Sequence, residues 1–485
     1  MENLFSINSR ETLFRVILGL SLLISIFLSY SLVSKNYHFL FFLIGLALSL
    51  FLMKSKTLPI VVILSVIPFT DWAIEQGFLP FQIMWFPELL SGLLFLKVLV
   101  QTVARKQNFR TAGFKFVLLF LFIAFYSLIY NSSGLIPALL MLRLLFRYYI
   151  LFLAILNLDL DEKAMKLINS FLMIIFLLQL PLAIVKLLIY GQGETSLSLS
   201  SHSLSTIIPL IAVSFLYAFY FLYKKKAIYL FGILSFVGFS IIGGKRAFIF
   251  FLIALIVFLT WILIRQIRLN LRAIFIGVIL ICVSFYFAAR LLPRFNPQNK
   301  VWGDFSIKHI INFAVEYETG VTEAGMTTGR ISTTINVFNH LSKNGFQHLT
   351  FGFGPGVIIK SMFAGYDRKE APRKSFGIGY GENGLTWLSI QVGYLGALIF
   401  FIFLYSFLKE SYLYFRQEND QYWQSFAAGM VGFTFIFIIA SLLYTPFFNS
   451  DSVSVFYFYL AAIVIIRKVT SGSIQISTSQ AQIKR

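Results

Sequence analysis

Long runs of apolar residues recur along nearly the whole chain, and they constrain its fold more than any other feature. A bilayer core about 30 Å thick needs about 20 apolar residues in each helix that crosses it, and this sequence offers such runs repeatedly. Hydrophobic residues make up 58% of the 485 residues and charged residues only 12%, about half the charged share of a soluble domain. The sequence therefore predicts an all-α polytopic membrane protein.

Polar breaks divide the apolar runs into about fourteen predicted membrane spans. Residues 1–291 are predicted to form an N-terminal bundle of about eleven spans and residues 385–466 a C-terminal group of about three. A long segment, 292–384, separates them, and a basic tail, 467–485, follows. The predicted spans are 15–34, 37–53, 58–76, 86–104, 113–130, 136–156, 167–190, 206–222, 227–242, 247–264, 273–291, 385–407, 424–446 and 453–466.

The placement of Lys and Arg predicts the orientation. The formal net charge is +20, which in a soluble protein would suggest nucleic acid as a partner. Here the basic residues lie mostly at the ends of spans, so membrane topology explains them and no nucleic-acid partner is expected. Cytoplasmic loops carry an excess of Lys and Arg. On this rule both termini are predicted to be cytoplasmic, and segment 292–384 extracytoplasmic.

The long segment 292–384 carries amphipathic patterns of its own. Ile331, Ile335, Phe338 and Leu341 recur at helical spacing, which predicts a helix over 328–343. Thr327 or Thr328 is expected to cap its start, and Gly345 to end it. A second short helix is predicted at 305–317. Long connections with helices of their own are usually functional, so we expect a catalytic loop.

Two arginines lie inside a predicted span. Arg143 and Arg147 are four residues apart and share one helical face. A charge at the centre of a membrane helix costs roughly 2.5–3.5 kcal/mol on insertion scales, so both should face a partner or a wet cavity. Glu88, near the outer start of another span, is the expected counter-charge. Two interpretations stay open: an ion pair that joins two helices, or an anion site built on the planar guanidinium fork.

Cations also appear on the predicted outer side, where they are normally scarce. Lys245 and Arg246 follow Gly243 and Gly244 in a turn between spans, and they either bind an anion or reach toward lipid headgroups. Arg330 stands in the first turn of the predicted 328–343 helix, where a cation opposes the helix dipole. Local stability therefore does not explain Arg330.

Two further motifs lie in or beside the long segment. The glycines of 351–356, among them Gly352 and Gly354, could bring backbone N–H groups close to an anion, although such runs are also ordinary turns. Glu382 and Asn383 stand at the mouth of the span that follows. Glu382 is a candidate general base, and its alternative role is to cap the helix.

Two further polar segments lie outside these motifs. His202, in the Ser-rich stretch 191–205, lies on the predicted outer side and is a candidate ligand contact. Residues 159–162 read Asp-Leu-Asp-Glu and look like the D-x-D element of metal-dependent sugar transferases. They lie on the predicted cytoplasmic side and open a helix, where acids are favoured, so we interpret them as a cap and expect no metal site.

Taken in chain order, these pieces resemble the O-antigen polymerase and ligase superfamily. The matching pieces are Gly244-Lys245-Arg246-Ala247, Gly329-Arg330, Gly352-Phe353-Gly354, Glu382-Asn383-Gly384-Leu385 and Gly393-Tyr394-Leu395-Gly396. Arg143 and the late position of the long outer loop also fit. The resemblance covers roughly residues 130–400, and the order of the motifs carries it.

The resemblance implies a metal-independent, integral-membrane glycosyltransferase of the GT-C type that needs no cofactor. Such enzymes use undecaprenyl-pyrophosphate-linked oligosaccharides at the outer side of the bacterial plasma (inner) membrane, in the biosynthesis of lipopolysaccharide and other cell-envelope polysaccharides. The ligase branch usually has a His-Asn or His-Ser pair where this chain has Glu382-Asn383, which favours a polymerase that uses lipid-linked repeat units as donor and acceptor. A ligase that moves glycan to lipid A core or to protein is the alternative, and a chain-length regulator is a candidate partner.

On this resemblance, Arg246 and Arg330 are assigned to the pyrophosphate and Glu382 to the proton of the attacking hydroxyl. Expected substrate contacts are Lys245, Arg143, Arg147, His202, Gly352, Gly354 and Asn383. Arg143 and Arg147 serve either cavity structure or the acceptor's phosphate. A lipid-linked oligosaccharide flippase is the non-enzyme alternative, and it would be expected to have two similar halves and short loops, which this sequence lacks.

Overall fold

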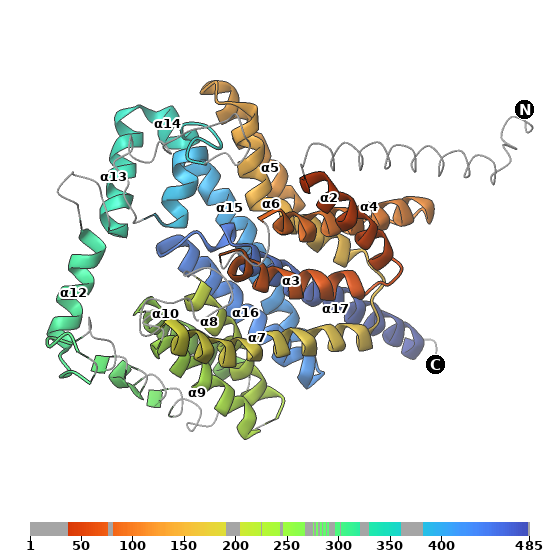
Figure 1. The fold of residues 1–485 in the computed structure, drawn as a ribbon. Coiled ribbons are helices and arrows are strands. Elements are labelled where there is room, and N and C mark those ends of the chain that lie inside the picture. The colour runs from red at the N-terminus through yellow and green to blue at the C-terminus, as the bar shows by residue number, and fades with distance from the viewer. Residues whose placement is uncertain are drawn as a thin grey trace, which may run out of the picture.

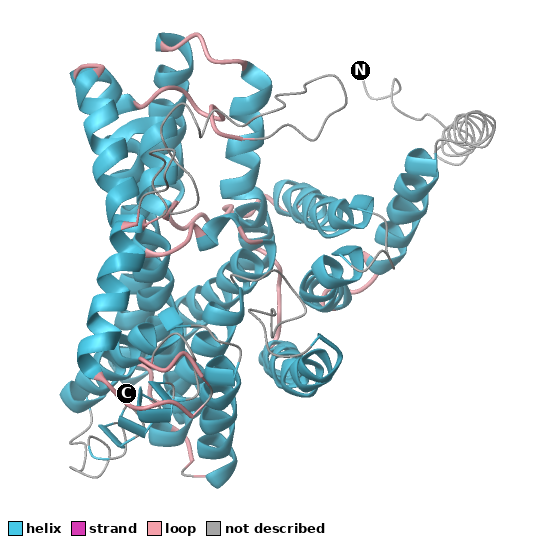
Figure 2. Cartoon of the chain, turned by 60° about the vertical axis from the view of Figure 1, so that its left-hand side comes forward, coloured by secondary structure: helices cyan, strands magenta, loops and turns pink. Residues whose placement is uncertain are grey.

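The computed structural model describes most of the chain as helices joined by short connections. Within the described residues every regular element is helical, and Figure 2 shows helices and loops there without a strand. The described residues are 37–75, 81–190, 204–224, 226–242, 246–266, scattered positions in 275–290, 296–300, 302–320, 329–359 and 382–483. The fold of the described chain is therefore all-α, as the sequence predicts.

The helices follow one another in chain order with bounds close to those of the predicted spans (Figure 1). They are α2 Tyr37–Leu52, α3 Leu58–Glu75, η1 Phe81–Met84, α4 Trp85–Ala104, α5 Phe114–Tyr130, α6 Leu135–Leu156, α7 Glu162–Tyr190, α8 Leu204–Leu222, α9 Ala227–Ile242, α10 Arg246–Gln266, α12 Ile307–Thr319, α13 Arg330–Lys343, α14 Phe346–Phe351, α15 Gly384–Gln417, α16 Gln421–Leu443, η4 Phe447–Asn449 and α17 Asp451–Ile483.

Seven of the described helices are long and apolar enough to cross a membrane, judged by length and composition, and four shorter ones are also apolar. These are the helices of a membrane-embedded protein. The long ones contain Trp85–Ala104, Leu135–Leu156, Glu162–Leu182, Ala247–Arg265, Gly384–Gln417, Gln421–Leu443 and Asp451–Thr470.

Four predicted segments differ from the helices or fall outside them. The predicted span 15–34 lies outside the described residues, as does most of 273–291. Helix α15 continues ten residues past the predicted limit at 407, because 408–417 contains no glycine or proline that would stop it. Helix α17 continues past the predicted span limit at 466 to Ile483, so most of the predicted tail 467–485 is helical.

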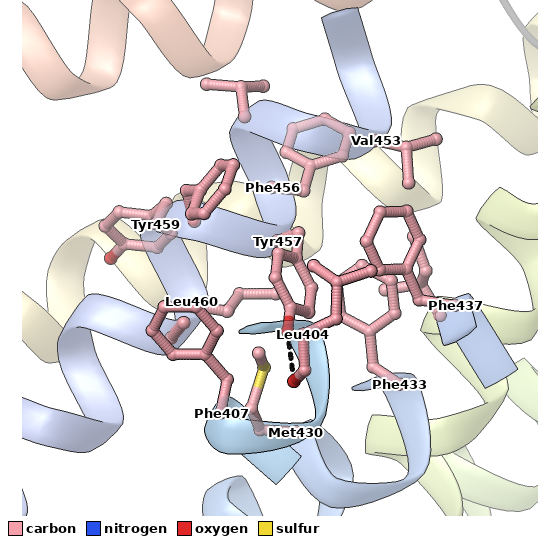
Figure 3. Close-up of a cluster of buried hydrophobic side chains, with 14 of the residues drawn as sticks. Leu404, Phe407, Met430, Phe433, Phe437, Val453, Phe456, Tyr457, Tyr459 and Leu460 are labelled. Carbon is pink, nitrogen blue, oxygen red and sulfur yellow. Dashed lines mark hydrogen bonds between the residues drawn. The ribbon is translucent and has the colours of Figure 1, made fainter. Parts of the chain in front are cut away.

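A dense aromatic core joins α15, α16 and α17 (Figure 3). Tyr457 of α17 is fully buried. Its ring packs against Phe433 and Phe437 of α16 and Phe407 of α15. Its hydroxyl donates to the carbonyl of Leu404 at 3.3 Å, so the polar tip has a partner inside the apolar core. This core fixes the helices whose other ends carry the candidate site.

Small residues let α8 and α16 approach closely. The hydroxyl of Ser214 donates to the carbonyl of Gly429 at 2.7 Å. A Cβ on Gly432 would lie 2.3 Å from the same hydroxyl, so only glycine fits there. Close packing through small residues is usual between membrane helices, where burial of apolar surface gives little driving force.

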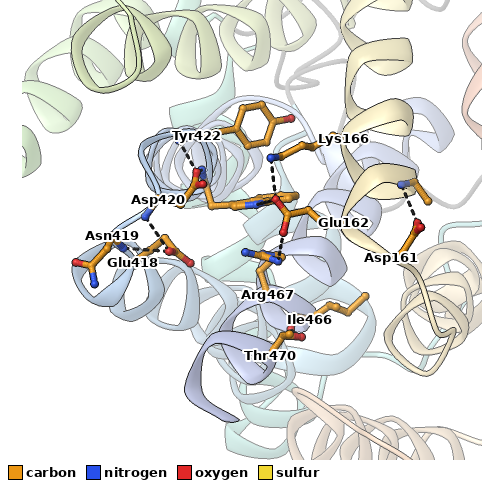
Figure 4. Close-up of polar contacts among 12 residues, drawn as sticks. Asp161, Glu162, Lys166, Glu418, Asn419, Asp420, Tyr422, Ile466, Arg467 and Thr470 are labelled. Atoms are coloured by element: carbon orange, nitrogen blue, oxygen red, sulfur yellow. Dashed lines mark hydrogen bonds and ion pairs between the residues drawn. The ribbon is translucent and has the colours of Figure 1, made fainter. Parts of the chain in front are cut away.

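The connections gather at two ends of the bundle, and the first is named here the Lys56 end. It comprises the connections 53–57, 105–113, 157–161 and 418–420. Lys56 pairs with Asp159 at 3.2 Å. Glu162, at the start of α7, pairs with Lys166 at 2.7 Å and with Arg467 of α17 at 2.9 Å (Figure 4). Asp161 accepts a hydrogen bond from the backbone of Ala164, which confirms that 159–162 caps a helix.

The opposite end is named the Arg330 end. It comprises the connections 131–134 and 444–450, the segment 329–359 and residues 382–383. Asn131 donates to the carbonyl of Gly352 at 3.1 Å, and Arg330 donates to the carbonyl of Tyr444 at 2.8 Å. Helices α13 and α14 lie along this edge beside the start of α15 (Figure 1). Which compartment each end faces stays a prediction.

Helix α15 is broken near the Arg330 end. Gly393 has φ 70° and ψ 177°, outside the helical region. The segment that follows α14 fills the break: Phe353 and Gly354 donate from their backbone N–H groups to the carbonyls of Ile390 at 2.8 Å and Gln391 at 3.1 Å. Irregular backbone is tolerated among membrane helices where protein covers it. Part of the long segment 292–384 thus packs among the helices.

Substitution of Gly393 by alanine is expected to destabilise the fold strongly. The positive φ alone costs of order 1–3 kcal/mol for a residue with a Cβ, and that Cβ would lie 2.0 Å from the carbonyl oxygen of Thr350. The thermal unfolding midpoint in detergent measures the loss. Gly92→Ala is the matched control, since nothing lies within 4 Å of a Cβ there. Equal midpoints for the two variants would contradict this account of the break.

Candidate functional site

An ion-pair network joins three helices at the Arg330 end. Arg143 makes a two-pronged contact with Glu88, through Nε at 2.7 Å and Nη2 at 2.8 Å. Arg147 pairs with Glu88 at 3.1 Å and also with Asp451, the first residue of α17. It donates further to the carbonyl of Asn449 at 3.1 Å. The side chains of Arg147 and Asp451 are each only 9% exposed.

This geometry confirms Glu88 as the counter-charge of both arginines. The network joins α4 to α6 and α6 to α17. The interpretation of Arg143 and Arg147 as members of an ion pair between helices is therefore confirmed. Arg143 is 37% exposed and lies nearer to water than Arg147. A contact between either arginine and substrate stays a prediction.

Arg330 is the first residue of α13, as the sequence predicts, and it is held from three sides. Its Nη1 pairs with Glu318 of α12 at 3.0 Å, and its Nε donates to the carbonyl of Tyr444 at 2.8 Å. The guanidinium also lies over the Tyr444 ring, 3.9 Å from the centroid. The side chain of Arg330 is only 14% exposed, so these contacts hold its guanidinium in one orientation.

The start of α13 differs from the predicted one. The N-cap residue is Gly329, whereas Thr327 or Thr328 was expected to cap the helix; both threonines lie outside the described residues. Gly329 is required because α12 packs against it: a Cβ there would lie 2.1 Å from the carbonyl oxygen of Glu318. The predicted end is confirmed, since Gly345 follows the C-cap with φ 99°. The second predicted helix, 305–317, is α12, shifted by two residues.

Glu382 and Asn383 open α15, with different roles. Asn383 is the N-cap: its Oδ1 accepts from the backbone of Thr386 at 2.9 Å, and the Thr386 hydroxyl completes a capping box. The interpretation of Glu382 as the cap is therefore wrong. Glu382 is half-buried, with Oε1 shielded from solvent. Asn383 also donates to the hydroxyl of Thr334 at 3.0 Å, which joins α15 to α13.

These contacts bring Arg330 and Glu382 to one junction. Thr334, which Asn383 contacts, lies one turn after Arg330 and donates to its carbonyl. The start of α15 also touches the end of α16, because a Cβ on Gly384 would lie 2.4 Å from the carbonyl oxygen of Ser441. We name this meeting point of α13, the start of α15 and the end of α16 the outer junction.

The glycines of 351–356 do not form an open anion cradle. The N–H of Gly352 donates to the carbonyl of His348 at 2.8 Å, that of Gly354 to the carbonyl of Gln391, and that of Gly356 to the Gln391 side chain at 3.0 Å. The predicted binding of an anion by these N–H groups is therefore wrong, because α14 and the broken helix α15 already accept their hydrogen bonds. Positive φ angles of 74°, 107° and 83° explain why the three positions are glycine.

Three predicted site residues cannot be placed. His202 and Lys245 lie outside the described residues, and the side chain of Arg246 does too, although its backbone begins α10. Their assigned contacts with substrate remain predictions.

Four residues that hold the arginines were not predicted from the sequence. Glu318 and Asp451 contribute carboxylates, Tyr444 its carbonyl and ring, and Asn449 its carbonyl. One signal was available, because Asp451 is a lone acid at the start of an apolar run. A buried carboxylate of this kind usually has a cationic partner.

The described part of the chain contains no group of three His, Cys, Asp or Glu side chains arranged to hold a metal ion. Fold and contacts together define a helical, membrane-embedded protein with charged residues at both ends of the bundle, among them the ion-pair network of the Arg330 end. No protein-family model matches the sequence, and no curated protein matches it.

Proposed function

We propose that this chain is a metal-independent glycosyltransferase of the bacterial plasma membrane that polymerises undecaprenyl-pyrophosphate-linked oligosaccharide repeat units at the outer face. The proposal includes about fourteen spans in a GT-C-like arrangement, with the Arg330 end facing away from the cytoplasm. It continues the resemblance to the O-antigen polymerase and ligase superfamily and favours the polymerase branch.

The observation that carries the proposal is the outer junction itself. Arg330 of α13 and Glu382 just before α15 are 52 residues apart in the sequence (382 − 330), and the hydrogen bond from Asn383 to Thr334 joins the two segments that carry them, near the end of α16. Glu318 and the carbonyl of Tyr444 orient Arg330. Glu382, whose Oε1 is shielded from solvent, directly precedes Asn383 at the start of α15. A cation and a carboxylate are the two groups that the proposed transfer from a pyrophosphate uses.

The proposed reaction uses each group at a separate bond. A hydroxyl of the acceptor sugar attacks the anomeric carbon of the donor, and the bond from that carbon to the pyrophosphate oxygen breaks. Arg330 stabilises the negative charge that grows on the departing pyrophosphate; preorganised groups of this kind are usually the largest catalytic contribution. Glu382 accepts the proton of the attacking hydroxyl. Undecaprenyl pyrophosphate and the lengthened chain are the products.

Glu382→Gln is expected to reduce turnover by about 10²–10⁴-fold, since the amide cannot accept the hydroxyl proton. The assay incubates purified protein with lipid-linked repeat units and follows oligosaccharide length over time. Glu316→Gln is the matched control, because it makes the same chemical change at an exposed position of α12 and should leave turnover unchanged. Normal turnover of Glu382→Gln would remove the general-base assignment.

A further inference from the structure

A cavity of about 820 Å³ lies at the Lys56 end, among the ends of α2, α4 and α6. Helix α4 packs against both of the others (Figure 1). Cavities of 300–1,000 Å³ hold ligands of small-molecule size. One carboxylate, Asp159, lines the cavity. Five cationic side chains line it as well: Lys54, Lys56, Lys97, Arg105 and Arg110. Five positive charges less one negative charge leave a formal net charge of +4.

The walls of this cavity are held in place by internal bonds. The backbone N–H of Arg110 donates to Asn157 Oδ1 at 2.6 Å, and Asn157 Nδ2 donates back to the Arg110 carbonyl at 2.9 Å. Lys97 Nζ donates to the carbonyl of Met53 at 2.5 Å. These bonds join the connection 105–113 to 157–161 and α4 to the end of α2. Hydrogen bonds within the protein therefore hold the segments that carry the cations.

Membrane topology and helix capping explain only some of the five cationic side chains that line the cavity. Lys97 caps the end of α2, and Lys56 pairs with Asp159. Across the ranges that the structure describes, no ion-pair partner approaches the guanidinium groups of Arg105 and Arg110. An excess of cations at one end of a membrane protein does not require them to surround one cavity, where their mutual repulsion is unfavourable. An anion in the cavity would balance that repulsion.

The surroundings of the cavity indicate where such an anion comes from. Two stripes of exposed apolar side chains at helical spacing lead to the cavity, one on α2 and one on α4. They are Ile44, Leu48 and Phe51, and Leu96, Val100 and Val103. The first stripe ends under Lys54, whose Nζ lies 5.3 Å from the centre of the Phe51 ring. The second ends two residues before Arg105.

We propose that this cavity binds the phosphate-bearing headgroup of an anionic phospholipid, with the acyl chains along the two apolar stripes. Basic pockets between membrane helices bind lipid headgroups of this kind. The guanidinium groups of Arg105 and Arg110 contact the phosphate oxygens, for which their planar fork is suited. The site is at the opposite end of the bundle from the outer junction, and it does not depend on the proposed function.

The test counts lipids retained by the full-length protein in an uncharged detergent, by native mass spectrometry. Wild-type protein is offered phosphatidylglycerol or phosphatidylcholine at equal concentration, and a third sample receives inorganic tripolyphosphate. Arg105→Gln with Arg110→Gln removes two cations from the cavity. Lys224→Gln with Lys226→Gln is the matched control, because it removes two exposed cations from a different connection. Unfolding midpoints without added lipid show whether both double variants fold as wild type does.

Wild-type protein is expected to retain phosphatidylglycerol at least tenfold more than phosphatidylcholine. The Arg105/Arg110 variant should weaken that binding roughly 30-fold, at about 1 kcal/mol for each cation, while the Lys224/Lys226 variant keeps it. Equal retention of the two lipids, or equal loss in both variants, would overturn the proposal. Tighter binding of tripolyphosphate than of lipid would overturn the lipid assignment and assign the cavity to a soluble polyphosphate.

Discussion

Replacing Arg330 by alanine is expected to reduce polymerisation by about 10²–10³-fold, the usual effect of removing one group that stabilises transition-state charge. The guanidinium lies at the outer junction, where the departing pyrophosphate gathers negative charge in the proposed reaction. The initial rate of oligosaccharide lengthening measures the effect, and the amount of folded protein in the membrane shows that the loss is catalytic.

Glu318→Gln separates catalysis from packing. Arg330 also pairs with Glu318 and donates to the Tyr444 carbonyl, so a merely structural arginine would make the Arg330→Ala and Glu318→Gln losses equal. We expect Glu318→Gln to lower the rate of oligosaccharide lengthening less than about tenfold, since the amide oxygen can still accept a hydrogen bond and the cation remains. Arg330→Lys keeps the charge without the planar fork and should fall between the two. Full polymer length from Arg330→Ala would refute the assignment of this residue.

Replacing Arg147 by methionine is expected to lower the free energy of unfolding by about 3–5 kcal/mol, the range for breaking a buried ion pair by removing one partner. Arg147 pairs with Glu88 and Asp451 in a region that water barely reaches. Its loss leaves the carboxylate of Asp451 buried beside an apolar chain. Unfolding by heat or denaturant in a fixed detergent measures the difference.

Two further variants test the cause of that loss. Arg143→Met should cost less, because this side chain is 37% exposed and pairs with Glu88 alone in the network. Adding Asp451→Asn to Arg147→Met should recover part of the stability, since no unpaired charge then remains at position 451. If Arg147→Met and Arg143→Met unfold alike, the network does not hold α6 and α17 together in the way described.

Much of the helical architecture follows from the sequence, because it depends on local pattern. An apolar run near 20 residues long gives a helix whichever helices surround it, so α4, α6 and α16 lie close to their predicted limits. The helix α13 follows from its spacing of Ile331, Ile335 and Phe338, and its Arg330 takes the predicted first position. The pairing of Glu88 with both arginines follows from the cost of burying a charge alone.

Other features depend on contacts between distant segments, and local pattern does not reveal them. The glycines at 352, 354 and 356 suggested an anion site, yet their N–H groups donate to acceptors on α14 and on the broken α15. The break at Gly393 is visible only in its dihedral angles. Asp451 and Glu318 become partners of arginines only when α17 and α12 are in place. Asn383, rather than Glu382, caps α15 because its amide oxygen accepts a hydrogen bond from the backbone N–H of Thr386.

The connection 444–451 links the two charged groups of the Arg330 end. It accepts from Arg330 at Tyr444, accepts from Arg147 at Asn449 and supplies Asp451. The buried network of α4, α6 and α17 therefore sets the position of the chain that holds Arg330. Stability of that network and geometry of the outer junction are physically connected through these eight residues (444 to 451 inclusive).

Glycosyl transfer by the purified protein is tested most directly by reconstituting it with undecaprenyl-pyrophosphate-linked repeat units and no other protein. We expect a ladder of longer lipid-linked oligosaccharides, with one undecaprenyl pyrophosphate released for each repeat joined. Repeat units that stay at their original length, or that only cross the bilayer unchanged, would contradict it.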